Sequence, residues 1–162
     1  MNRMLIGFLA AAAFVGGTVV SVAFAADAAP AAALTVFDEA HFLAAAEDSI
    51  KRGDKDGAVQ LFQSAIVYAP NDPVPYQKLA DFYAGNGQGE LASQFFNTAL
   101  DVQPAFAPAI RGLALLALSS GNRAGAQAQH ELLLRACGAN CPETSQVEKA
   151  LRDAGVTSAG RP

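Results

Sequence analysis

The sequence contains few of the residues that build catalytic and metal sites. Its 162 residues include two cysteines, two histidines and no tryptophan. Two cysteines cannot supply a disulfide-rich scaffold or a zinc site of four thiolates, and two histidines cannot make a histidine-rich metal site. Lys and Arg number 11 against 15 Asp and Glu, so the chain lacks the basic excess of a nucleic-acid-binding domain. We expect no cofactor, no metal and no nucleic-acid partner.

Motifs that carry catalysis are also missing. No serine lies in a Gly-x-Ser-x-Gly elbow, and no His-Glu-x-x-His sequence occurs. The glycine-rich segment at 85–89 has no preceding strand pattern and no following Gly-Lys-Ser/Thr, so it indicates a turn rather than a phosphate loop. We therefore expect a protein that is not an enzyme and has no catalytic residues.

The N-terminus has the anatomy of an export signal. After Arg3, residues 4–26 carry no charge, and Ala23 and Ala25 give the small-x-small pattern that signal peptidases cleave. We predict a signal peptide over residues 1–25, cleavage after Ala25 and a periplasmic protein, followed by an Ala-rich leader over 26–38. The alternative is an uncleaved anchor facing the periplasm, because about 20 apolar residues span a bilayer. Membrane contact is expected only in that case.

The remaining chain repeats with a period of 34 residues. Glycines recur at this spacing at positions 53, 87 and 121, and no gap is needed to keep the register. The other recurring sets are Ala46, Ala80 and Ala114; Ala58, Ala92 and Ala126; Phe62, Phe96 and His130; and Pro70, Pro104 and Gly138. A repeat of this period predicts a stack of similar supersecondary units.

Each copy has the apolar pattern of two helices. In the second copy, Tyr76, Leu79, Ala80 and Tyr83 follow the i, i+3, i+4, i+7 spacing of one helical face. Glycines then mark a turn, and a second apolar helical pattern ends before Pro104. The pattern predicts an all-α chain of helical hairpins.

The repeat resembles the tetratricopeptide repeat (TPR) in period and in residue types. The second copy matches its pattern at Leu79, Tyr83, Ala92, Phe96, Ala99 and Pro104. The resemblance implies an α-solenoid of three TPR helix hairpins over 39–140, with copies at 39–72, 73–106 and 107–140. The third copy departs from the pattern at His130, Leu133 and Gly138.

A C-terminal helix is expected to close the stack. Pro142 suits a first helical position, and the apolar residues Val147, Ala150, Leu151 and Ala154 share one face. Gln146 and the charged residues around it are expected to face water. We predict a capping helix over 141–155 and a tail over 156–162.

Cys137 and Cys141 flank the expected turn before the capping helix. In an oxidising compartment the favoured interpretation is a structural disulfide, which contributes about 2 kcal/mol for a five-residue loop. A redox pair or a metal site stays an alternative, although the spacing is not Cys-x-x-Cys and no thioredoxin-like pattern surrounds it. His130 and His41 are interpreted as core or edge residues.

The resemblance places ligands on the concave side, which the first helices of the repeats line. The predicted protein- or peptide-binding residues are Leu43, Glu47, Ile50, Val74, Gln77, Lys78, Asp81, Arg111, Leu115 and Leu118. Chaperone-binding relatives grip a C-terminal carboxylate with Lys and Asn, and this set lacks the Asn and most of the Lys. A partly apolar groove suits an extended peptide or an amphipathic helix. Alternatively, Leu115 and Leu118 are covered by the leader or by a neighbouring helix.

The sequence therefore predicts a periplasmic, non-enzymatic TPR scaffold that binds a protein or peptide. The alternatives are a membrane-anchored structural subunit of a cell-envelope complex and a thiol–disulfide redox protein. Residues 27–106 carry 11 acids and 4 bases, whereas residues 107–162 carry 4 acids and 6 bases. This asymmetry leaves homo-oligomerisation open, although it also fits an ordinary solvated surface.

Overall fold

The computed structural model describes residues 38–156, which form seven α-helices and no β-strand. The helices are α1 (Glu39–Lys51), α2 (Lys55–Tyr68), α3 (Pro73–Gly85), α4 (Gly89–Val102), α5 (Ala107–Ser119), α6 (Arg123–Ala136) and α7 (Pro142–Asp153). None of these seven helices has both the length and the apolar character needed to cross a bilayer. The expected signal peptide, the leader up to residue 37 and the tail from residue 157 lie outside the described residues.

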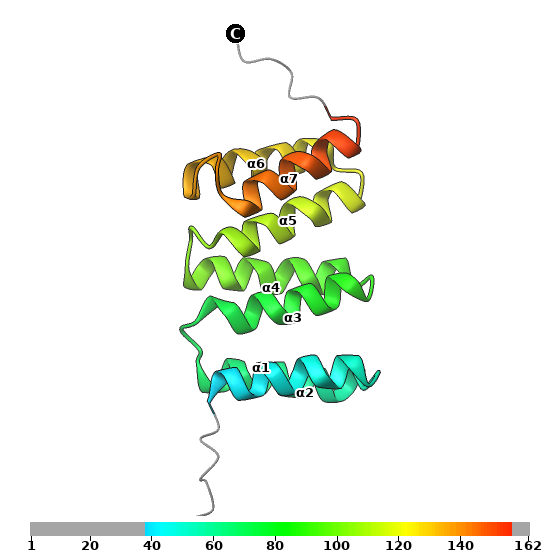
Figure 1. Ribbon diagram of the computed structural model, residues 1–162, viewed down its shortest axis with the longest axis vertical. Coiled ribbons are helices and arrows are strands. Elements are labelled where there is room, and N and C mark those ends of the chain that lie inside the picture. Colours follow the sequence, from blue (N-terminus) through cyan, green and yellow to red (C-terminus); the bar gives the residue numbers. More distant parts are fainter. Residues whose placement is uncertain (1–37, 157–162) are drawn as a thin grey trace, which may run out of the picture. The chain divides into compact units, whose positions relative to one another are not determined.

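The helices pack as hairpins stacked in chain order (Figure 1). α1 packs on α2, α3 on α4 and α5 on α6, and each hairpin also contacts the next. α7 lies against both helices of the last hairpin. The predicted all-α solenoid of helical hairpins is confirmed.

The turn within each hairpin requires a glycine. Gly53, Gly87 and Gly121 have φ of 80°, 76° and 75°, a left-handed conformation that costs other residues free energy. In the second hairpin, the Gly87 N–H donates to the Ala84 carbonyl and the Gln88 N–H donates to the Tyr83 carbonyl. This is the Schellman motif, which satisfies the last carbonyl groups of a helix. The 34-residue spacing of the glycines is therefore the spacing of equivalent helix ends.

Acidic and amide side chains begin several of the helices. Asp38, Asp54, Asp72 and Asn122 precede α1, α2, α3 and α6, and each side chain accepts a backbone N–H of the first turn. Such a cap contributes about 1 kcal/mol, because it satisfies a donor that has no partner within the helix.

Small and large side chains alternate through the core. The alanines at the recurring positions are fully buried and let the helices approach closely. Phe62 and Phe96 fill the space between hairpins and are 2% and 1% exposed. At Gly112 on α5, an added Cβ would lie 2.2 Å from Cζ of Phe96. The backbone of α5 thus contacts the aromatic ring of the preceding hairpin directly.

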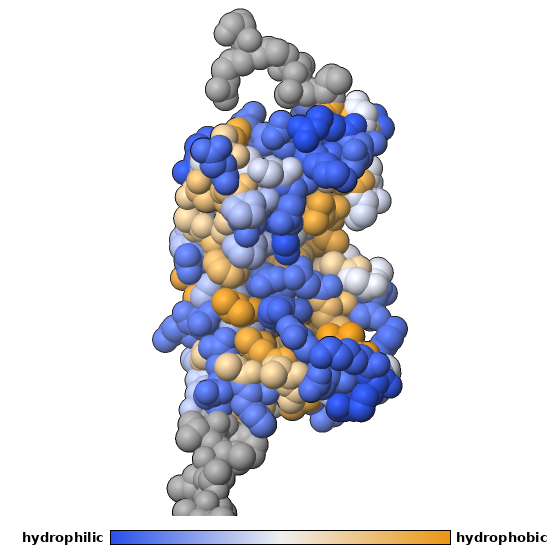
Figure 2. Space-filling model, in the orientation of Figure 1, coloured by the Kyte–Doolittle hydropathy of each residue, from blue (hydrophilic) through white to orange (hydrophobic). Residues whose placement is uncertain are grey.

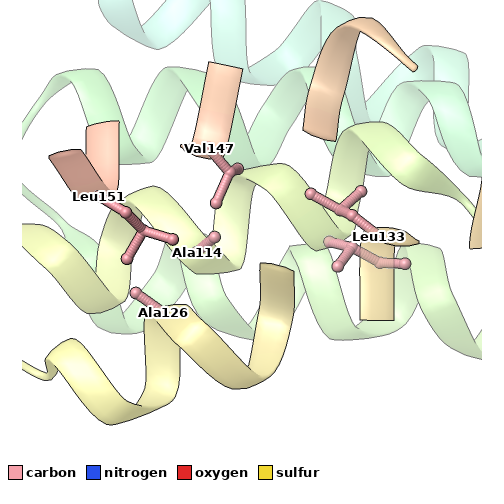
Figure 3. Close-up of a cluster of buried hydrophobic side chains, with 6 residues drawn as sticks. Ala114, Ala126, Leu133, Val147 and Leu151 are labelled. Carbon is pink, nitrogen blue, oxygen red and sulfur yellow. The ribbon is translucent and has the colours of Figure 1, made fainter. Parts of the chain in front are cut away.

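α7 covers the apolar side of the last hairpin. Val147 and Leu151 pack with Ala114, Ala126 and Leu133 in one buried cluster (Figure 3). Val147 is fully buried and Leu151 is 6% exposed, so the helix closes a core that α5 and α6 alone would leave open.

The two histidines have different surroundings. His130 replaces the phenylalanine of the earlier copies and is half-buried, with its Nε2 shielded from solvent and without a hydrogen-bond partner. This agrees with the expected core or edge position. His41 is exposed on α1, where its ring packs edge-on against Phe42.

Candidate protein-interaction face

The odd-numbered helices α1, α3, α5 and α7 form one face of the stack, which we call the odd-helix face (Figure 1). All ten predicted binding residues lie on three of these helices. α1 carries Leu43, Glu47 and Ile50; α3 carries Val74, Gln77, Lys78 and Asp81; α5 carries Arg111, Leu115 and Leu118. They share a face because neighbouring hairpins stack with their first helices in contact.

Two ion pairs join the odd helices in sequence. Lys78 Nζ donates to Glu47 Oε1 at 2.8 Å, linking α3 to α1. Arg111 Nη2 lies 3.6 Å from Asp81 Oδ2, linking α5 to α3. Each pair therefore crosses from one hairpin to the next. Partly exposed pairs such as these contribute only about 0–1 kcal/mol each.

The row of polar contacts continues onto α7. Arg111 Nη1 donates to Gln146 Oε1 at 3.2 Å. The amide of Gln77 donates to Asp81 within α3. We call Glu47, Lys78, Asp81, Arg111 and Gln146 the polar ladder. Sequence reasoning missed Gln146, because only the packing of α7 against α5 brings its amide to Arg111.

The two carboxylates of the polar ladder have opposite pKa shifts. The hydrogen bond from Lys78, together with its charge, lowers the pKa of Glu47 below its ordinary value. Burial raises the pKa of Asp81, and the nearby charges of Arg111 and Lys78 oppose that rise only in part. Formal charge along the ladder is balanced, with two acids and two bases in contact with one another.

Three of the predicted binding residues contribute to packing instead of standing free. Gln77 is only 7% exposed, which corrects its expected outward position. The reason is its place in the middle hairpin, where α3 is covered by both α1 and α5. Leu43 and Leu118 are half-buried against the apolar clusters of the first and last hairpins.

Exposed apolar side chains flank the polar ladder. Ile50 is 42% exposed near the end of α1, and Leu115 is 40% exposed on α5. Figure 2 shows hydrophilic surface running along the middle of this face, with hydrophobic patches beside it. The surface therefore offers apolar contacts around a charge-balanced centre.

The structure brings Cys137 and Cys141 together at the turn between α6 and α7. Their sulfur atoms lie 2.11 Å apart, at bonding distance, and their Cα atoms are 5.7 Å apart. With Glu143 they form the single group of three metal-ligating side chains found within the described residues. Bonded sulfurs are not thiolate ligands, so this group in its bonded form does not fit a metal.

A second apolar surface on the first hairpin was missed in the sequence. An open groove of about 660 Å³ is lined by Phe42, Val67 and Tyr68 together with polar residues of α2. Val67 is 81% exposed and Tyr68 is 55% exposed. Adjacent Val and Tyr at the end of an amphipathic helix were the available signal, but the repeat pattern alone does not say which residues an end hairpin leaves uncovered.

Comparison with known proteins agrees with this fold. The family model of the tetratricopeptide repeat matches residues 49–118. No curated protein matches the chain significantly.

Solved structures with the same fold share little sequence with the chain. The TPR2B domain of yeast Sti1, solved in a complex with pHsp70, is 18% identical with a TM-score of 0.64, over 72% of this chain and 95% of that one. The chaperone SycD of Yersinia enterocolitica, bound to a peptide of the translocator YopD, is 20% identical with a TM-score of 0.62, over 72% and 92%. The first TPR domain of Spaghetti (RPAP3), bound to the HSP90 peptide SRMEEVD, is 16% identical with a TM-score of 0.61, over 73% and 96%.

Proposed function

Because this chain is a tetratricopeptide-repeat protein, we propose that it is a non-enzymatic adaptor that binds a protein or peptide on its odd-helix face. The repeat fold is typical of interaction scaffolds, and two of the similar structures hold peptides. The observation that carries the proposal is the exposed apolar surface of Ile50 and Leu115 beside the polar ladder. Apolar side chains around charge-balanced polar contacts suit docking of a peptide or a helix.

The polar ladder determines which peptides fit this face. Lys78 and Arg111 are the two cations among the predicted residues, and each contacts an acid of a neighbouring helix. An acidic C-terminal carboxylate would have to break these pairs, and Glu47 and Asp81 would repel it. The partner that fits is a segment with apolar side chains and little net charge.

We also propose that the protein is exported to the periplasm. The support is the sequence of residues 1–25, with cleavage after Ala25, and export would place Cys137 and Cys141 where a disulfide persists. Mass spectrometry of the secreted chain should find Ala26 as its first residue and no free thiol. A chain that keeps residues 4–26 in the membrane fraction would instead support the anchored subunit.

Capture of partners from the cell envelope after mild cross-linking tests the adaptor proposal. The test variant is Ile50→Ser/Leu115→Ser, which alters exposed side chains of the odd-helix face. The matched control is Leu91→Ser/Leu132→Ser, because these leucines are 38% and 39% exposed on α4 and α6. We expect a stoichiometric partner that the control retains and the test variant loses. Equal capture by both variants would overturn the proposed face.

A defined probe tests the charge argument. Labelled peptide SRMEEVD, which binds the similar RPAP3 domain, should give no saturable change in fluorescence anisotropy with this chain. Saturable binding that disappears with Arg111→Gln would mean that the ladder opens to grip a carboxylate, contrary to the proposal.

A further inference from the structure

The two cysteines at the α6–α7 turn differ in residue exposure and in local structure. Cys137 is exposed and follows the last residue of α6. Cys141 is 9% exposed and is the N-cap of α7, a helix of 12 residues. A reagent approaching from solvent therefore reaches Cys137 more readily than Cys141.

From this asymmetry we infer that the pair is a site of directional thiol–disulfide exchange, in addition to the adaptor function. The inference depends on the proposed disulfide. An external thiolate attacks Sγ of Cys137, and a new S–S bond forms to that sulfur. The Cys137–Cys141 bond breaks, and its electron pair leaves on Sγ of Cys141. The product is a mixed disulfide at Cys137 and a reduced Cys141, so the co-reactant is a thiol in its thiolate form.

The position of Cys141 favours it as the leaving sulfur. Exchange is faster when the departing thiol is the better-stabilised thiolate. The N-terminus of a helix carries partial positive charge, which stabilises a thiolate there, although in the bonded form the Cys141 sulfur accepts no backbone N–H of α7. Cys137 lies at the opposite kind of helix end, the C-terminus of α6, where a thiolate is disfavoured. Exposure and helix polarity thus select the same direction.

Glu143 opposes the release of Cys141. Its Oε2 lies 2.9 Å from Sγ of Cys141, so a carboxylate faces the sulfur on which negative charge develops. After the bond breaks, the sulfur takes a proton from water and the S–H can donate to this carboxylate. Glu143 is therefore a positioning residue that slows exchange and holds the reduced sulfur in place.

The capping helix is also held by contacts other than the disulfide. Thr144 is 1% exposed, and its Oγ1 donates to the Gly138 carbonyl at 2.9 Å, which ties α7 to the turn. Val147 and Leu151 are buried against the last hairpin. Breaking the S–S bond leaves these contacts intact, so Cys141 stays within reach of Cys137 and the bond can form again.

The test uses the full exported chain and reduced glutathione as the thiolate. Limiting glutathione is added, the reaction is quenched with acid, and the modified cysteine is located by peptide mapping. We expect glutathione on Cys137. Single variants then compare the two thiols with a chromogenic disulfide. At a pH where both thiols are ionised, Cys137 in Cys141→Ser should react at least about tenfold faster than Cys141 in Cys137→Ser, because access and not thiolate formation then limits the rate. Glu143→Gln should accelerate the exchange of the wild-type bond.

Three results would overturn the inference. Glutathione found on Cys141, or on both cysteines equally, would exclude the direction. Loss of protease resistance of α7 on reduction would show that the disulfide holds the cap. Two free thiols in the exported chain would remove the bond itself. None of these readouts depends on partner capture, so the adaptor proposal is tested separately.

Discussion

At Gly112 the backbone of α5 lies against the ring of Phe96, with no room for a side chain between them. We expect Gly112→Ala to lower the free energy of unfolding by about 1–3 kcal/mol, the usual result of overpacking a dense core. Urea unfolding followed by circular dichroism measures the change. Gly85→Ala is the control, because a Cβ there meets no atom within 4 Å and φ is not positive. The control should leave stability unchanged or raise it by up to about 1 kcal/mol. Equal losses in both variants would exclude the Phe96 contact as the cause.

The two ladder carboxylates give stability opposite pH dependences. The lowered pKa of Glu47 means that its contribution is present above the unfolded pKa and is lost as pH falls. The raised pKa of Asp81 means that its contribution is present below the unfolded pKa and is lost as pH rises through the folded value.

We therefore expect Glu47→Gln to become more destabilising, relative to wild type, as pH rises from about 3.5 to about 6. Asp81→Asn should become less destabilising over the same range. Urea unfolding of both variants at several pH values measures the two slopes. The same sign of slope in both variants would contradict the opposite surroundings described for the two groups.

At the scale of the elements, α7 completes the core of the last hairpin. Val147→Ser/Leu151→Ser removes two buried side chains from its inner face, and we expect the free energy of unfolding to fall by about 3 kcal/mol or more. Glu148→Ser/Arg152→Ser changes the exposed ion pair on the outer face and should cost no more than about 1 kcal/mol. Urea unfolding of the full chain compares the two. Similar losses would mean that α7 is held by its surface contacts.

The elements were predictable because their signals are local. Asp54 and Asp72 begin helices through contacts within one turn, and Gly87 and Gly121 end helices at a single position. Helix boundaries can therefore be predicted from one sequence. Because the pattern repeats, each of these signals occurs again in the other copies. The exposure of a side chain, in contrast, depends on the neighbouring hairpins and not on local sequence.

The candidate face was predicted less well than the helices for that reason. Gln77 was expected to point outward but is buried, because α3 has a hairpin on either side. Gln146 is exposed as expected, but its contact with Arg111 on α5 was not foreseen. The exposed Val67 and Tyr68 belong to an end hairpin, and the repeat pattern does not distinguish an end copy from a middle one.

At the scale of the whole stack, the ion pairs distinguish hairpins that otherwise look alike. The three copies share their alanines and turn glycines, so these residues do not distinguish one order of the hairpins from another. Both ion pairs of the polar ladder form only when the hairpins follow the order first, second, third. α1 offers an acid, α3 a base toward α1 and an acid toward α5, and α5 a base.

If the third hairpin were placed before the first, Glu47 would keep Lys78, but Asp81 and Arg111 would lose each other as partners. The polar ladder thus favours one position in the stack for each copy. Recombination that duplicates or exchanges copies within such a gene would produce chains that fold but carry unpaired charges on the odd-helix face.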